Sequence, residues 1–344
     1  YDYYLWQGEK DCSAKKSGPS CAPPPPDAPL SQEDIAAFEA GNARPGLKRL
    51  PSDEKELAAF LLQASRSGQI RWVKSNNRKV YHMLQKEIDS SLPGQDVHIV
   101  FGMVHPGVEG QTEFINELLT EGKDKRKLKG VTHVALELVR TNPETEDSQR
   151  SLDRYLMTGK KTFELMPPAK WEGTGIPSET DREVAAKNNT FRIGYQQCYN
   201  LVMADTLYQY PKKVKTEAGE YSAREIYAVR SVLQRQDPNK RDVVVWAWGA
   251  THTEKHRLPF YLKIADPKAK VVSIALNGGT YVEALAFDRV LKKLGWLEQP
   301  FILKLDSYRE ADYVVHLPTA GRKRMWGISR EGDPVMQHIV NPPY

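Results

Sequence analysis

The sequence predicts an α/β fold in which a mostly parallel central sheet is flanked by helices. Short apolar runs, typical of buried parallel strands, alternate with helix-like stretches from residue 96 onward. Such alternation indicates βαβ units. Two of the runs, at 96–105 and 242–252, are built alike, because each ends in Gly-x-x-His and leads into a helix-like stretch.

Composition and charge limit the function classes that fit. The chain has 344 residues, of which 40% are hydrophobic, so one elaborated α/β domain with a sizeable core can absorb it. A net charge of +5, from 49 basic and 44 acidic residues, is too small and too mixed for a nucleic-acid-binding surface. The longest apolar runs fall far short of the ~20 residues that span a bilayer. We therefore expect neither a nucleic-acid partner nor a transmembrane segment.

The chain divides into three predicted parts. Residues 1–30 form an extended arm with four aromatic residues near its start and a run of four prolines, which favours polyproline II. This arm is either a flexible tail or a strap that docks on the body or on a second copy, which would give a homo-oligomer. Residues 31–94 are expected to form an N-terminal helical layer, and residues 95–344 the α/β domain.

The first residue and the cysteines favour an exported protein. The chain opens with Tyr1 rather than Met, which either processing or trimming would explain. Cys12 and Cys21 flank a polar loop, whereas Cys198 stands apart. In a periplasmic, cell-surface or extracellular protein, we expect a local Cys12–Cys21 disulfide and a free Cys198.

Hydrophobic spacing and capping residues place the expected elements. Two short helices are expected to begin at Ser31 and at Pro51. Further helices are expected at 76–91, 112–119, 199–208, 223–235 and 283–294, and one is expected to run from the end of the 242–248 strand to about 264. The expected strands are the run before Gly102, 132–138, 190–195, 242–248, 270–276 and 311–317, whereas 141–190 is read as mostly loops and short helices.

Three polar residues stand at the ends of predicted strands: His105, Glu137 and His252. Ligands of α/β proteins bind at the carboxyl ends of such strands, so these side chains should converge. Two imidazoles and a carboxylate suit Mn, Co, Zn or Fe, and the same set could act as acid and base on an ester or amide. The structural alternatives are an internal salt bridge between Glu137 and Arg140, and histidines that serve only the core.

His256 follows His252 by four residues and would share one face with it on a helix. A His-x-x-x-His pair can hold a metal, but the intervening residues do not match a metalloprotease motif. The alternative is a solvated helix face. The sequence has no Gly-rich phosphate-binding loop.

Seven short motifs, in order over about 95–318, resemble the ChaN-like haem-binding uptake proteins of the wider TIKI, TraB and erythromycin-esterase superfamily. They are Gly102–His105, Ala135–Leu138, Gln149–Gly159 with Trp171 following, Tyr199–Ala204 as a helix motif, Gly249–His252, Leu258-Pro259 and Ala311–Val314.

The resemblance implies an exported protein that binds haem or a metal ion in a cleft at the strand ends. The haem-contacting residues it implies are His105, His252, Tyr195, Trp248 and His256, with Trp246 as a further apolar wall.

Two alternatives stay open. One is a metal-dependent peptidase or esterase that uses His105, Glu137 and His252 as metal ligands or catalytic groups. The other is an inactive extracellular structural or assembly protein. Met103 stands where the family has an acidic or hydroxyl residue and Tyr199 where it has a basic one; both replacements weigh against hydrolysis.

Overall fold

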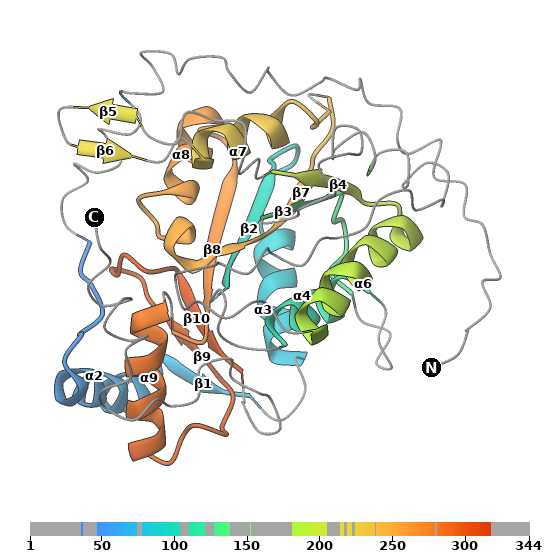
Figure 1. The fold of residues 1–344 in the computed structure, drawn as a ribbon. Coiled ribbons are helices and arrows are strands. Elements are labelled where there is room, and N and C mark those ends of the chain that lie inside the picture. Colours follow the sequence, from blue (N-terminus) through green and yellow to red (C-terminus); the bar gives the residue numbers. More distant parts are fainter. Residues whose placement is uncertain are drawn as a thin grey trace.

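The described part of the chain is an α/β domain built on a mostly parallel sheet (Figure 1). The computed structural model describes residues 36, 47–73, 78–103, 110–120, 127–137, 152, 181–204, 214–216, 219–221, 224–237, 239–278 and 281–317. The arm at 1–30, with Cys12 and Cys21, and the segment that holds His105 lie outside them.

The central sheet has eight strands among the described residues. In spatial order they are β1 (Ile70–Trp72), β9 (Phe301–Lys304), β10 (Tyr313–His316), β8 (Lys270–Leu276), β2 (Val97–Met103), β7 (Val243–Gly249), β3 (His133–Leu136) and β4 (Asn200–Met203). All neighbours from β10 to β4 pair in parallel, whereas β1, β9 and β10 pair antiparallel. A separate hairpin joins β5 (Val214–Thr216) to β6 (Gly219–Tyr221). The predicted mostly parallel sheet is therefore confirmed.

The two strands that carry the repeated motif are neighbours at the centre of the sheet. β2 pairs with β7 in parallel along its whole length, so that Gly102 lies beside Trp248 and Met103 beside Gly249. Apart from His98 in β2, both strands are apolar, and both are almost entirely buried, as expected for strands covered on both faces. Their carboxyl ends meet at one edge of the sheet, next to the end of β3.

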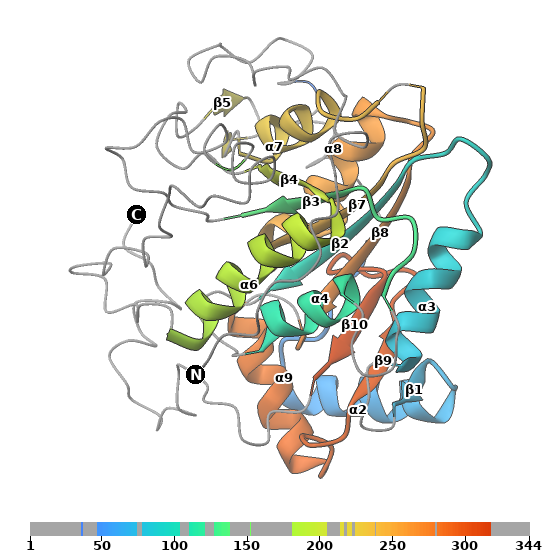
Figure 2. The same cartoon turned by 90° about the vertical axis from the view of Figure 1, so that its right-hand side faces the viewer.

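Helices cover both faces of the sheet, as the two views in Figures 1 and 2 show. One face packs against α3 (Arg78–Asp89), α4 (Gln111–Leu119) and α6 (Asp181–Gln197). The other packs against α7 (Arg224–Leu233) and α8 (Leu258–Ala265), and a third cluster joins α2 (Glu54–Arg66) to α9 (Tyr281–Lys293) over β1, β9 and β10. The N-terminal helices thus belong to the sheet domain, since α2 and α3 pack into different clusters and β1 joins the sheet.

Most expected elements form, but one region is reversed. Residues 190–195, expected as a strand, belong to α6, and residues 200–203, expected in a helix, form β4. The Thr190 hydroxyl donates to the carbonyl of Ala186 one helical turn earlier. Gly194 then lets Leu201 approach so closely that an added Cβ would lie 2.6 Å from its Cδ1. Packing of α6 on β4 overrides the β-branched and aromatic residues that favoured a strand.

The helix expected after β7 is interrupted. A 3₁₀ turn, η2 (Ala250–Thr253), follows the strand directly, and α8 begins only at Leu258. His252 and His256 therefore do not share a helix face. No helix among the described residues is long and apolar enough to cross a membrane.

Candidate functional site

The site is centred on His252, which η2 holds at the carboxyl end of β7. Its Nδ1 lies 2.7 Å from Oε1 of Glu225 on α7, and its Nε2 lies 3.7 Å from Oε1 of Glu137 at the end of β3. The His252 side chain is 15% exposed, whereas the side chains of Glu137 and Glu225 are 3% and 1% exposed. Of the three groups, the imidazole is therefore the one that a ligand from solvent can best reach.

Backbone and sheet geometry fix Glu137. Its own N–H donates to the carbonyl of Ala247, which extends the pairing of β3 with β7 by one residue. Its Oε2 accepts the backbone N–H of Gly249, where β7 ends. A buried carboxylate needs such partners, because its charge is costly to remove from water. Glu137 thus lies beside His252, and a common site of these two residues with His105 stays a prediction.

Glu225 is the residue that the sequence reasoning missed. It lies in the first turn of α7, whose apolar residues pack into the cluster on that face of the sheet. Arg257 Nη1 also donates to its Oε1, over 2.9 Å. Burial alone would raise the pKa of Glu225, but the charge of His252, their hydrogen bond and the charge of Arg257 outweigh it and lower the pKa to about 2. Glu225 is thus ionised at neutral pH and can orient the ring of His252.

The remaining predicted site residues lie elsewhere or outside the description. His105 falls outside the described residues, so its distance from His252 stays a prediction. Trp248 is completely buried in the cluster under α7 and α8, and its ring meets that of His252 edge-on at 5.8 Å. Trp246 is equally buried. The expectation that these two indoles line an open cleft is therefore wrong; Trp248 supports His252 from behind.

The structure also corrects the expectations for Tyr195 and His256. Tyr195 lies near the carboxyl end of α6, close to the start of β4 and so at the opposite edge of the sheet from Glu137. His256 is buried rather than solvated, with Nε2 2.6 Å from Arg309 Nη2 and Nδ1 3.3 Å from Glu254 Oε2. Burial first, and then the charge of Arg309, lower the pKa of His256 to about 3, so it is a neutral structural residue.

Cys198 differs from its expected state, because it takes part in a disulfide. The chain has three cysteines, and the other two lie outside the described residues. The expectation of a free Cys198 is wrong.

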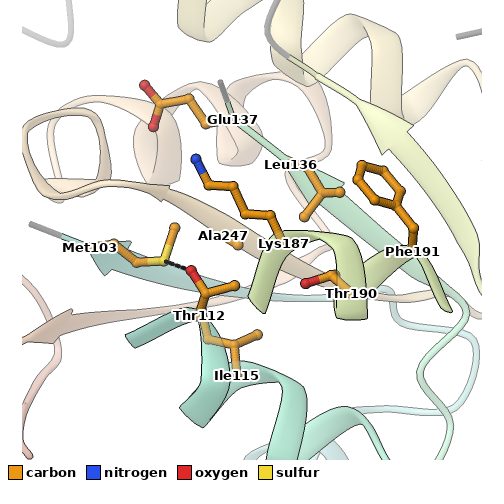
Figure 3. Close-up of a pocket in the computed structure, with 9 residues that line it drawn as sticks. All are labelled: Met103, Thr112, Ile115, Leu136, Glu137, Lys187, Thr190, Phe191 and Ala247. Atoms are coloured by element: carbon orange, nitrogen blue, oxygen red, sulfur yellow. Dashed lines mark hydrogen bonds between the residues drawn. The ribbon is translucent and has the colours of Figure 1, made fainter. Parts of the chain in front are cut away.

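A small pocket opens beside Glu137, on the α4 and α6 side of the sheet (Figure 3). Its volume is about 20 Å³, and a water-sized group needs roughly 10–15 Å³. Its walls are mainly apolar, with Glu137 and Lys187 as its two charged residues: they comprise Met103, Thr112, Ile115, Leu136, Glu137, Lys187, Thr190, Phe191 and Ala247. Figure 3 shows the Lys187 side chain extending from α6 toward Glu137.

A metal would need donors beyond this set. Within the part of the chain that the structure describes, no three His, Cys, Asp or Glu side chains are grouped to hold a metal ion. His252 nevertheless has the arrangement of many metal-binding histidines, with one ring nitrogen on a carboxylate and the other facing the site. His252 and Glu137 fit a metal as two of its ligands, and the predicted third, His105, lies outside the described residues.

Comparisons with known proteins add little. No family model matches the sequence, and no curated protein matches it. A solved structure described as "Bacterial protein toxins" is 14% identical, with a TM-score of 0.33, over 71% of this chain and 42% of the other. The chain thus spans less than half the length of that structure, and a likeness at this level carries no argument about function.

Proposed function

We propose that the protein hydrolyses an ester or amide, with His252 as the general base. The observation that carries this proposal is the Glu225–His252–Glu137 arrangement at the strand ends. Glu225 is ionised and lies on Nδ1, which places the ring proton there and makes Nε2, on the Glu137 side of the ring, the nitrogen that would accept a proton from water. This is the relation between carboxylate and imidazole that acid–base catalysis uses.

The surroundings of His252 support the same role. Two buried carboxylates would stabilise the positive charge that the ring gains when it takes a proton. Arg257 balances the charge of Glu225, so that the pair does not leave a lone buried carboxylate. Trp248 contacts the ring edge-on and restricts its rotation.

A metal-dependent form of the same activity is the second candidate. It is favoured by one observation, the carboxylate on Nδ1 that metal-binding histidines commonly have. Elemental analysis of the purified protein, followed by chelation, separates the two forms. Bound Mn, Co, Zn or Fe and loss of turnover on chelation support the metal-dependent form, whereas turnover that survives chelation supports His252 as the base.

Haem binding has less support from the described residues. The pocket volume of about 20 Å³ is far below the ~300–1,000 Å³ of typical small-molecule sites. Of the three aromatic residues expected to contact a porphyrin, Trp246 and Trp248 are buried and Tyr195 lies at the other edge of the sheet. A Soret band that appears on haem addition and is lost in His252→Ala would restore this function.

An exported location is part of the proposal. The disulfide at Cys198 supports it, because disulfides persist mainly in oxidising compartments. The arm at 1–30 and a homo-oligomer built through it stay predictions.

The test is a panel of esters and amides assayed with the parent, His252→Ala and His82→Ala. His82 is an exposed histidine on α3 and serves as the matched control. Loss of the base should lower kcat by roughly 10²–10⁴-fold, whereas His82→Ala should leave it unchanged. Equal turnover by the parent and His252→Ala, with both proteins folded, would refute the proposal.

A further inference from the structure

We infer that His98 is an acid-sensitive switch beneath the layer formed by α7 and α8, and that its protonation releases this layer from the sheet. Three observations support the switch: a histidine inside a fully buried strand, a hydrogen bond that only its neutral ring can make, and a helical layer that alone covers that face. The switch itself does not depend on the proposed function, whereas its effect on catalysis does.

His98 is a polar residue within β2, and it is completely buried. Side chains alternate between the two faces of a strand. Ile99 and Phe101 belong to the cluster under α3, α4 and α6, whereas Val100 belongs to the cluster under α7 and α8. His98 therefore points to the face that α7 and α8 cover, and its hydrogen bond to Trp246, a member of that cluster, agrees with this.

The surroundings of the His98 ring require its neutral form. Trp246 Nε1 lies 3.1 Å from His98 Nδ1, and because an indole N–H can only donate, Nδ1 must be unprotonated. The ring proton is then on Nε2, which is buried and has no hydrogen-bond partner among the described residues. A second proton would replace the tryptophan bond at Nδ1 and leave a buried charge with both of its N–H groups unpaired. Such a charge is stable only where water can reach it.

The helical layer is the part of this face that can withdraw and admit water. α7 and α8 supply the helix residues of the cluster that contains Trp246. Beyond the end of α7, the carbonyl oxygen of Arg235 lies 3.1 Å from Nε2 of His133 on β3. The strands β2, β7 and β3 stay joined by their parallel backbone pairing. Hydration of His98 therefore requires the helices, rather than the strands, to move.

The pH range follows from the two states of His98. Burial first, and then the charge of His133, lower the pKa of His98 to about 3 in the closed protein, whereas a hydrated histidine takes up a proton near pH 6.5. The layer is therefore fully held above pH 6.5, and its hold weakens as the pH falls below that value.

Neighbouring titratable groups modify this response. Burial also lowers the pKa of His133, although the carboxylate of Asp242, 3.5 Å from its Nδ1, opposes the shift. Burial lowers the pKa of His256, just before α8, to about 3, so this residue acts in the same direction as His98. Asp96 at the amino end of β2 acts in the opposite direction, because burial raises its pKa. The pKa of Glu225 on α7 is lowered to about 2, so its charge persists throughout the range.

Release of the layer would also dismantle the proposed catalytic arrangement. α7 carries Glu225, whose Oε1 lies 2.7 Å from Nδ1 of His252. Withdrawal of α7 removes this carboxylate from the ring that it orients. If His252 is the general base, acid should therefore abolish turnover through His98, and neutralisation should restore it.

The test measures amide hydrogen exchange at about pH 7 and pH 5, corrected for its intrinsic pH dependence, in the parent, His98→Asn and His316→Asn. The asparagine oxygen can accept the Trp246 N–H but cannot be protonated. His316 is the matched control, since it is buried on β10, stacks on Phe301 in the cluster between α2 and α9, and has a pKa that burial lowers to about 4.

In the parent, exchange of the α7 and α8 amides should accelerate by roughly 30-fold between the two pH values, and exchange of the α4 amides, on the other face of the sheet, by much less. His98→Asn should lose most of this acceleration, whereas His316→Asn should keep it. Equal acceleration in His98→Asn and the parent, or acceleration that extends evenly to α4, would overturn the switch.

A second variant and a second measurement complete the test. If His98→Asn does not fold, Trp246→Phe decides: the closed state then lacks the bond that only the neutral ring accepts, so opening should begin at a higher pH, and an unchanged pH dependence would overturn the switch. Ester turnover is followed in the same samples. Acid-triggered exchange in α7 without turnover at neutral pH would refute the hydrolase and leave the switch standing.

Discussion

Replacing Gly102 with alanine tests how the repeated motif builds the site. An added Cβ would overlap Thr253 Oγ1, and it would approach the Cα of Ala250 to 3.1 Å and the Cβ of Thr253 to 3.3 Å. These atoms belong to η2, the turn that holds His252. Overpacking of this kind costs about 1–3 kcal/mol, and the lower chain entropy of alanine offsets roughly 0.4–1 kcal/mol. We expect a net loss of about 1–2 kcal/mol.

The assay is urea unfolding followed by tryptophan fluorescence, together with ester turnover. The midpoint should fall with an unchanged slope. Turnover should fall by at least about tenfold, because a displacement of 1 Å in a catalytic group can cost about 10². Thr253→Ala removes the overlapping oxygen, which otherwise donates to the Ala250 carbonyl over 2.9 Å. The double variant should therefore recover about 1 kcal/mol relative to the sum of the single variants. A parental midpoint for Gly102→Ala, or strict additivity, would refute this account.

Three further predictions concern buried polar groups. Burial, as the main cause, lowers the pKa of His98 to about 3 and that of His316 to about 4 in the folded protein. In the unfolded chain both histidines take up a proton near pH 6.5. The free energy of unfolding should therefore fall as the pH drops below 6.5, by roughly 1.4 kcal/mol per pH unit for each histidine. An unfolding midpoint that does not change between about pH 7 and pH 5 would contradict this. Glu225→Gln should lower the free energy of unfolding by about 1–3 kcal/mol at neutral pH. Because the pKa of Glu225 is lowered to about 2, the difference in stability between parent and variant should shrink as the pH falls from about 4.5 toward 2, as measured by thermal unfolding. Trp246→Phe should lower the free energy of unfolding in urea by about 1–3 kcal/mol more than Trp248→Phe does. The reason is that Trp246 Nε1 donates to His98 Nδ1 over 3.1 Å, whereas Trp248 Nε1 has no partner among the described residues. Equal losses would argue against the hydrogen bond between Trp246 and His98.

The sheet could be predicted from the sequence because its central strands carry a strong local pattern. β2, β7 and β8 are nearly continuous apolar runs, and such runs occur in strands that are buried on both faces. The sequence does not predict the edge strand β1 or its neighbour β9, which lies between β1 and β10. Each is short, and the pairing of β1 with β9 joins residues more than 200 positions apart. Neither carries a pattern long enough to be recognised alone.

The reversal at 190–203 has a different cause. Residues 190–195 at the end of α6 alternate in a way that suits a strand, and residues 199–208, which include β4, have the aromatic and apolar spacing of a short helix. What decides between them is contact: the Tyr199 hydroxyl donates to the carbonyl of Leu119 on α4, and β4 pairs with β3. Partners of this kind are distant in sequence, so local propensity has no access to them.

The site itself was half predictable. Glu137 and His252 were found because a polar residue at the end of an apolar strand is unusual and its position implies an edge of the sheet. The expectation that His256 shares a helix face with His252 is wrong, because four-residue spacing indicates a shared face only where the helix is continuous. Here a 3₁₀ turn intervenes. The Arg309 side chain that contacts His256 comes from a position 53 residues away.

Glu225 could not be recognised as a site residue from the sequence alone. A glutamate in the first turn of a helix is ordinary, since it interacts favourably with the helix dipole, and nothing in its own sequence context marks it. Its neighbour Ile226 packs with Val229 against the cluster that contains Trp248, and this packing fixes the face that α7 turns to the sheet. Glu225 cannot then reach solvent without withdrawing those side chains from the core. Its charge must be balanced where it stands, by His252 and Arg257, so the apolar face of α7 determines which nitrogen of His252 is left to act.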